Sequence, residues 1–156
     1  MQANELLKNL NRSDLTLAAT PLMLWELGAV NNMDEVAQFM YRGGPWPPQG
    51  SAKKPKDDFL YLLTDERPDK KYWVMLKEEL TLFLCTNDKK YKRLWARINA
   101  LESKSTNVIV LVVSGYLGEK FGIQASLIAG FVAVFFYGVI KVGKEAYCRL
   151  ALPGDA

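Results

Sequence analysis

Residues 105–140 read STNVIVLVVSGYLGEKFGIQASLIAGFVAVFFYGVI and contain only two charged side chains, Glu119 and Lys120. The whole chain of 156 residues has 20 Lys and Arg and 17 Asp and Glu residues, so charge is almost excluded from this stretch. Residues 121–140 are uncharged, and as a helix they would measure roughly 30 Å, the thickness of a bilayer's hydrocarbon core. The stretch therefore predicts membrane contact.

The first part of the stretch, residues 105–118, would measure only about 21 Å as a helix. Five of its residues are β-branched, which in water favours a buried strand. The chain has no second run of this quality to pair with it, and the glycines that follow match no phosphate-binding motif. We therefore expect a helix. The β-branched residues are Val108, Ile109, Val110, Val112 and Val113.

Cations flank the stretch on both sides, and its centre offers only Lys120. By the positive-inside rule, this favours a helical hairpin with both ends cytoplasmic and Glu119 and Lys120 at the far turn. A single span with the first arm in the interface, and a hairpin buried in a soluble bundle, are the alternatives. The flanking cations are Lys89, Lys90, Lys92, Arg93, Arg97 and Lys104 before the stretch, and Lys141, Lys144 and Arg149 after it.

Small side chains recur along the second arm and allow two helices to approach closely. They favour a hairpin or an oligomer in lipid, although a buried helix of a soluble bundle uses the same residues. Gly118 and Gly122 have GxxxG spacing and can also be read as helix ends. The predicted helix-packing seam consists of Gly118, Gly122, Ala125, Ser126, Ala129, Gly130, Ala133 and Gly138.

The segment before the stretch predicts a basic amphipathic helix, in which Tyr91, Leu94, Trp95, Ile98 and Leu101 form the apolar stripe. Its cations suit the surface of an anionic inner leaflet, and a solvated face is the simpler interpretation. The predicted basic interfacial face consists of Lys89, Lys90, Lys92, Arg93 and Arg97.

Helical patterns also fill the N-terminal part, so we expect an all-α protein. Residues 1–103 form a predicted soluble helical domain, interrupted by a Pro/Gly-rich loop at 43–58. Residues 104–150 form the apolar hairpin or single transmembrane helix, and 151–156 form a tail. The clearest soluble helix has a buried face of Trp73, Leu76, Leu80, Phe83 and Leu84.

The residue inventory argues against an enzyme, since the chain has no histidine and therefore lacks the usual general base and most zinc sites. Cys85 and Cys148 are far apart in sequence, so we predict no disulfide framework, an inert buried thiol at Cys85 and a reducing compartment. No catalytic, metal or cofactor site is predicted. A cluster of carboxylates is interpreted as surface and helix caps: Asp57, Asp58, Asp65, Glu66 and Asp69.

These features predict a small membrane-associated effector or accessory protein at the inner membrane, with its N-terminal domain in the cytoplasm. Its hairpin would anchor in or perturb the bilayer, and its N-terminal domain would bind an unidentified protein, as in bacterial conflict or defence. Anionic lipid and further copies of the chain are the other expected partners. The net charge of +3 is too small to suggest nucleic acid. The alternative is a soluble adaptor or oligomeric subunit that buries the apolar helices.

Overall fold

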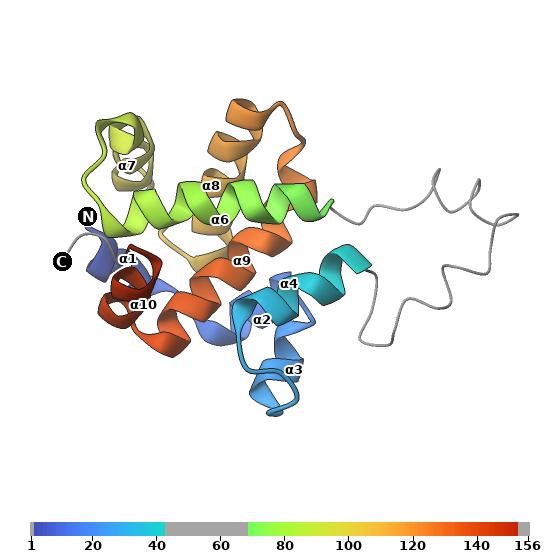
Figure 1. Cartoon of the computed structure of the whole chain (residues 1–156). Helices are drawn as coiled ribbons and strands as arrows, with labels where there is room; N and C mark the ends of the chain where they lie inside the picture. Colours follow the sequence, from blue (N-terminus) through green and yellow to red (C-terminus); the bar gives the residue numbers. More distant parts are fainter. Residues whose placement is uncertain (1, 43–68, 153–156) are drawn as a thin grey trace, which may run out of the picture.

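The computed structural model describes residues 2–42 and 69–152, and these ranges are helical without any strand (Figure 1). The predicted all-α class is thereby confirmed. The 43–58 loop and all of the carboxylate cluster except Asp69 lie outside the described residues. In chain order the helices are α1 (Ala3–Asn9), α2 (Arg12–Ala18), α3 (Leu22–Glu26), α4 (Met33–Arg42), α6 (Lys70–Cys85), the 3₁₀ turn η2 (Lys89–Tyr91), α7 (Lys92–Asn99), α8 (Thr106–Phe121), α9 (Ala125–Val142) and α10 (Lys144–Ala151).

The centre of the molecule is α9, which contacts α2, α4, α6, α8 and α10 (Figure 1). Nine consecutive residues of α9, 131–139, are buried, so this part of the helix is covered around its whole circumference, whereas its first turn is partly exposed. A helix that is apolar all round is stable only when it is enclosed in this way or placed in lipid. The arrangement of the other helices therefore follows from the need to cover α9.

The covering helices begin where the sequence supplies caps. The Asp69 side chain accepts a hydrogen bond from the Lys71 N–H at the start of α6, and the Asn32 side chain accepts one from the Glu35 N–H at the start of α4. All five predicted core residues of α6 are buried. Amphipathic periodicity thus predicted the buried face of α6 correctly.

The two apolar helices are joined by a tight turn, and its position corrects the predicted one. Glu119 and Lys120 belong to the last turn of α8, and the chain reverses at Gly122, whose φ is +71°. The N–H of Ile123 donates to the Gly118 carbonyl at 2.9 Å, which closes a Schellman motif. A Cβ at Gly118 would lie 2.6 Å from the Ile123 oxygen, so both glycines are needed for the turn. The interpretation as helix ends is therefore confirmed for Gly122 and is wrong for Gly118, which lies inside α8.

One hydrophobic core includes residues from both predicted segments. Leu6, Leu22, Leu76 and Leu94 belong to the same buried cluster as residues of α8 and α9. The predicted boundary at 103/104 falls between α7 and α8. The helices before this boundary therefore provide much of the surface that keeps α9 from water.

Candidate functional site: the apolar hairpin and its cover

Within the described residues, α9 is the one helix long and apolar enough to cross a membrane, with 18 residues from Ala125 to Val142. A core helix of a soluble protein meets the same criterion, and α9 occupies the position of a core helix here. Phe131, Phe135 and Phe136 are each fully buried. The structure therefore presents a membrane-length helix of which 56%, including all of residues 131–139, is buried by protein.

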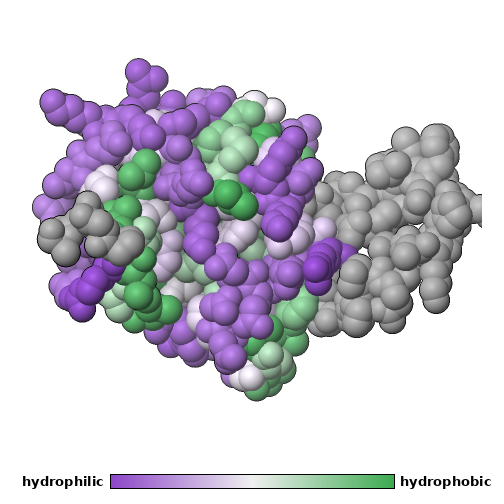
Figure 2. Space-filling view, viewed as in Figure 1, coloured by the Kyte–Doolittle hydropathy of each residue, from purple (hydrophilic) through white to green (hydrophobic). Residues whose placement is uncertain are grey.

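The other arm, α8, has 16 residues and is only partly covered. Ile109, Val113 and Leu117 are fully buried on one side, whereas Leu111 is 60% exposed. Figure 2 shows a largely hydrophilic surface interrupted by separate hydrophobic patches. The hairpin consists of one enclosed arm and one arm that also forms part of the outer wall.

The predicted seam is distributed over different environments. Gly118 and Gly122 form the turn, Ala133 is buried, Ala125 and Ala129 are half-buried, and Ser126 is exposed. The seam therefore does not form one continuous exposed face. Oligomerisation through it stays a prediction.

Gly130 and Gly138 are occupied by contacts within the chain. A Cβ at Gly138 would lie 3.0 Å from the Cβ of Met33 on α4. A Cβ at Gly130 would meet the terminal methyl group of Met40, also on α4. These glycines let α4 approach α9 closely, which is the packing role that the sequence pattern predicted for a buried helix.

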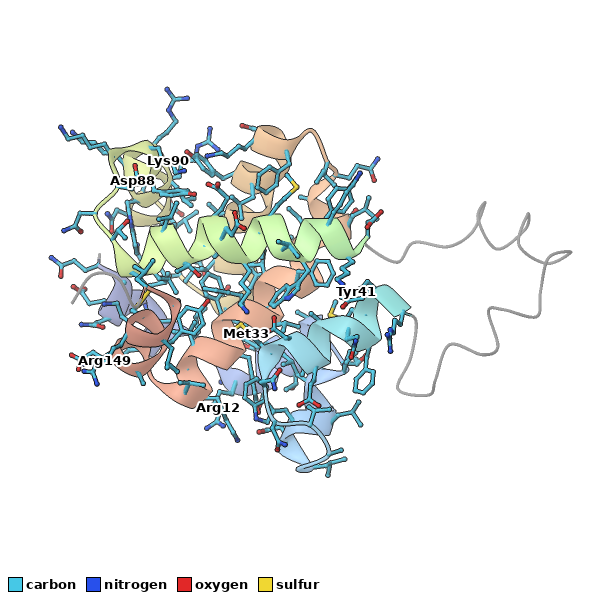
Figure 3. The ribbon with its side chains drawn as sticks, viewed as in Figure 1. Arg12, Met33, Tyr41, Asp88, Lys90 and Arg149 are labelled. Carbon is cyan, nitrogen blue, oxygen red and sulfur yellow. A yellow bond between two sulfur atoms is a disulfide. The ribbon has the colours of Figure 1, made fainter. Side chains whose placement is uncertain are left out.

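The predicted basic face divides into two groups (Figure 3 labels Lys90). Lys90 forms an ion pair with Glu79 at 3.4 Å, and the Arg97 guanidinium lies 5.7 Å from the centre of the Tyr116 ring. Lys89, Lys92 and Arg93 are exposed. The last three are therefore the cations that remain available to an external anionic surface.

A carboxylate on α6, Glu79, joins the end of α8 to the covering helices. It accepts hydrogen bonds from the hydroxyl of buried Tyr91 and from Lys120, whose Nζ lies 3.0 Å from the Glu79 oxygen. Lys90 completes the cluster. Burial opposes the ionisation of Glu79, but the hydrogen bonds from Tyr91 and Lys120 and the charges of Lys120 and Lys90 outweigh it and lower its pKa. Burial and the same carboxylate raise the pKa of Tyr91.

A second cluster of the same composition joins the end of α9 to α2 and α3. Glu26 accepts a hydrogen bond from the hydroxyl of Tyr137, and Arg12 and Lys141 lie 3.7 and 3.6 Å from its carboxylate. The Arg12 guanidinium also lies 5.5 Å from the centre of the Tyr137 ring. The hydrogen bond from Tyr137 is the main reason that the pKa of Glu26 is lowered, despite some desolvation.

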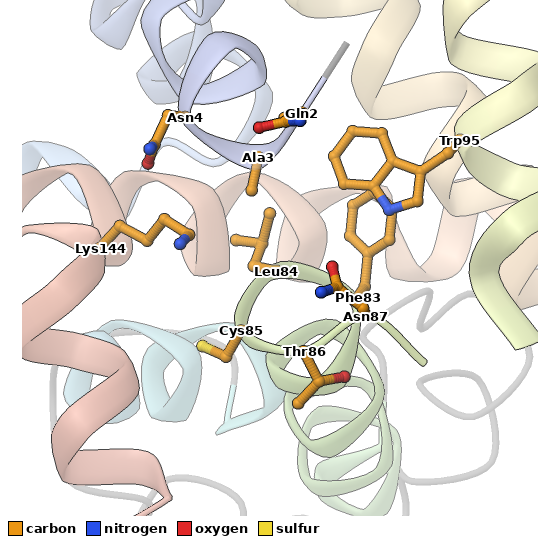
Figure 4. Close-up of a pocket in the computed structure, with 10 residues that line it drawn as sticks. All are labelled: Gln2, Ala3, Asn4, Phe83, Leu84, Cys85, Thr86, Asn87, Trp95 and Lys144. Carbon is orange, nitrogen blue, oxygen red and sulfur yellow. The ribbon is translucent and has the colours of Figure 1, made fainter. Parts of the chain in front are cut away.

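A disulfide between Cys85 and Cys148 connects the end of α6 to α10. The prediction of an inert thiol at Cys85 and of no disulfide is therefore wrong. The two cysteines are 63 positions apart in sequence, and only the packing of α10 beside α6 brings them together. A cavity of about 440 Å³ opens beside Cys85, where Trp95 stacks on Phe83 at 4.4 Å (Figure 4).

A larger groove of about 570 Å³ lies between α4, α6 and α10. Trp25, Met33 and Leu82 provide apolar walls, and the hydroxyls of Thr81 and Tyr147 are 2.8 Å apart within its lining. Burial raises the pKa of Tyr147. Leu150, at the rim, is 77% exposed.

Sequence reasoning missed the two glutamates, the disulfide and the groove, because each joins residues that are distant in the chain. The only available signal was a tyrosine or lysine at the end of an apolar run, as at Tyr137 and Lys141.

No known family, curated protein or solved structure matches this chain. Functional inference therefore depends on the hairpin and its cover.

Proposed function

We propose that this chain is a small membrane-acting effector or accessory protein that stores an apolar hairpin inside a helical bundle. The hairpin enters the bilayer when the bundle opens, and there it anchors or perturbs the membrane. The covered, membrane-length α9 is the observation that carries this proposal. In water the covering helices shield the apolar surface of α9 from solvent, and lipid tails would shield it equally well.

The exposed cations of η2 and α7 support binding to an anionic leaflet. Lys89, Lys92 and Arg93 face solvent at the segment that precedes the hairpin. Basic side chains near an anionic surface contribute about 1 kcal/mol each, so three of them would strengthen vesicle binding roughly a hundredfold. Insertion of both arms also requires two lysines to separate. Lys120, which was predicted to lie at the far turn of the hairpin, and Lys90 of the basic face both pair with Glu79 in the folded state.

Dye release from vesicles of phosphatidylcholine and phosphatidylglycerol tests the proposal. We expect the full chain to release dye from these vesicles and to sediment with them, and to act much less on phosphatidylcholine alone. Replacing Lys89, Lys92 and Arg93 by Gln removes this preference. The matched control replaces Lys8, Lys70 and Lys71, three exposed cations on α1 and α6. Background release and a fully soluble protein under every condition would overturn the proposal.

The disulfide bears on the proposed location at the inner membrane. Disulfides persist in oxidising compartments and are reduced in the cytosol. If the N-terminal domain and the segment after the hairpin both lie in the cytoplasm, Cys85 and Cys148 are expected to be thiols, and on the opposite side of the membrane they are expected to be bonded. Alkylation of free thiols in intact cells, followed by mass measurement, distinguishes the two locations.

A soluble helical adaptor is the second candidate function. The apolar groove between α4, α6 and α10 favours it, because exposed Leu150 beside buried Trp25 and Met33 offers a surface for a partner's apolar side chains. This function needs α9 only as a core helix. Cooperative unfolding, no vesicle activity and quantitative recovery in the supernatant after ultracentrifugation would favour the adaptor.

A further inference from the structure

The two glutamate clusters occupy equivalent positions relative to the hairpin. In each, a carboxylate on a covering helix meets a lysine at the C-terminal end of one arm: Glu79 meets Lys120 of α8 at 3.0 Å, and Glu26 meets Lys141 of α9 at 3.6 Å. The two arms are therefore tied to the cover separately. We call these contacts the α8 latch and the α9 latch.

Each latch also contains a second cation from the cover and a buried tyrosine. In the α8 latch, Lys90 and Lys120 both lie 5.4 Å from the centre of the Tyr91 ring. In the α9 latch, Arg12 approaches the Tyr137 ring. Each carboxylate thus separates two cations that would otherwise face each other. The nearby charged and titratable groups are Lys90, Tyr91, Asp88, Tyr116 and Lys120 for the α8 latch, and Arg12, Tyr137 and Lys141 for the α9 latch.

Neutralising the carboxylate changes the sign of the interaction between cover and arm. Without the negative charge, Lys90 repels Lys120 and Arg12 repels Lys141. The tyrosine hydroxyls keep an acceptor in either form, so the main change is electrostatic. We propose that Glu79 and Glu26 are a pair of acid-sensitive latches, and that their protonation releases the two arms of the hairpin from the cover. This inference gives the proposed membrane function its trigger and depends on that function for its biological meaning.

The sign of the pH response follows from the directions of the shifts. Both carboxyl groups have a pKa lowered from 4.5 in the folded state. Their stabilisation is therefore complete above about pH 4.5 and is lost as the pH falls through the lower folded-state values. Acid is expected to open the latches, and neutral pH is expected to keep them closed.

Hydrogen exchange in the absence of lipid tests the latches independently of any membrane activity. The variant Glu26→Gln/Glu79→Gln imitates protonation at about pH 7. We expect amides of α8 and α9 to exchange about tenfold faster than in the wild type, as for the loss of a hydrogen bond to a charged group. The control is Asp34→Asn, because Asp34 pairs with Lys77 at 2.9 Å and accepts a hydrogen bond from Trp73, so these contacts join the covering helices α4 and α6. Unchanged exchange in α8 and α9 of the double variant would overturn the latch proposal, as would equal acceleration in Asp34→Asn.

If the double variant does not fold, the wild type at about pH 3 and pH 7 provides the same comparison, after correction for intrinsic exchange rates, because the folded-state pKa of both carboxyl groups lies below 4.5. Faster opening of α8 and α9 than of α4 and α6 in acid supports the latches, and uniform opening contradicts them. Dye release from phosphatidylcholine and phosphatidylglycerol vesicles is the separate readout for the proposed function. Opening without dye release retains the latches and rejects the membrane function. If the wild type and the double variant release dye at the same level and the double variant shows no faster exchange, the membrane function is retained and the latches are rejected.

Discussion

The two arms of the hairpin, α8 and α9, both contain long apolar runs but have different surroundings. In α9, residues 131–139 are all buried beneath five neighbouring helices. In α8, Leu111 is 60% exposed and the final turn carries Glu119 and Lys120. The difference shows that an apolar sequence predicts that a helix is buried, but not whether other helices surround it or cover only one of its sides. Only α9 has the character of a helix that must be either enclosed by protein or immersed in lipid.

Truncating an aromatic side chain in α9 should cause the largest loss of stability. Phe135 is fully buried, and its ring packs against Tyr147 at 5.4 Å. We expect Phe135→Ala to lower the free energy of unfolding by about 3 to 5 kcal/mol, measured by urea denaturation. The matched change in the other arm, Leu111→Ala, should cost less than about 0.5 kcal/mol because the side chain is mostly exposed. Equal losses would mean that the two arms are covered alike.

The disulfide should have the next largest effect, because it connects α10, which follows α9, to the covering helix α6. Replacing Cys85 and Cys148 by Ser should lower the free energy of unfolding by about 2 to 4 kcal/mol, since the cross-link closes a long loop. Treatment of the wild type with dithiothreitol should produce the same change, and the variant should not respond to it. A wild type whose unfolding ignores the reductant would contradict the bonded state.

The two glycines of α9 that face α4 should differ from each other. Gly138→Ala brings a Cβ to 3.0 Å from the Cβ of Met33, which cannot move without its backbone. We expect a loss of about 1 to 3 kcal/mol from overpacking. At Gly130 the obstacle is the flexible end of Met40, and alanine favours the helix by about 1 kcal/mol, so Gly130→Ala should be close to neutral. Similar thermal stabilities for the two variants would refute this account of the α4 contact.

The smallest effect should be the acid dependence that comes from Glu79. Its lowered pKa means that its contribution is present above about pH 4.5 and is lost below it. Glu79→Gln should remove about 1 kcal/mol of the stability difference between about pH 7 and pH 3, because solvent screens a partly exposed charge cluster. Glu78→Gln removes the same charge from the adjacent exposed position and should leave the wild-type pH profile intact. Parallel profiles for all three proteins would show that Glu79 has no special role.

Local features of the fold were predictable from the sequence because they depend on near neighbours. Periodicity predicted the buried face of α6, and all five of its predicted core residues are buried. The glycines near the end of α8 allowed two interpretations, and the structure makes Gly122 a helix end and leaves Gly118 inside α8. The exact turn was missed, because charged Glu119 and Lys120 continue the helix when Lys120 can reach Glu79.

Features that depend on distant pairs could not be predicted from one sequence. Glu26 and Tyr137 are 111 positions apart, and Cys85 and Cys148 are 63 apart. Nothing in their local sequence distinguishes these residues from an ordinary surface glutamate or a buried thiol. The burial of α9 by its neighbours could not be predicted for the same reason. The sequence of each neighbouring helix indicates which face is apolar but not which helix that face packs against.

The most direct test of a stored hairpin is to lock α9 to α4 covalently. A Cβ at Gly138 would lie 3.0 Å from that of Met33, and disulfides need about 3.5 to 4.5 Å, so the backbones of α4 and α9 must separate slightly for Met33→Cys/Gly138→Cys to form a bond. In a background with Cys85 and Cys148 replaced by Ser, this is the only possible disulfide. Under conditions in which the unlocked background protein releases dye from anionic vesicles, the oxidised protein should release none, and dithiothreitol should restore release. Undiminished release by the oxidised protein would contradict the account, because the membrane activity would then not require α9 to leave the bundle.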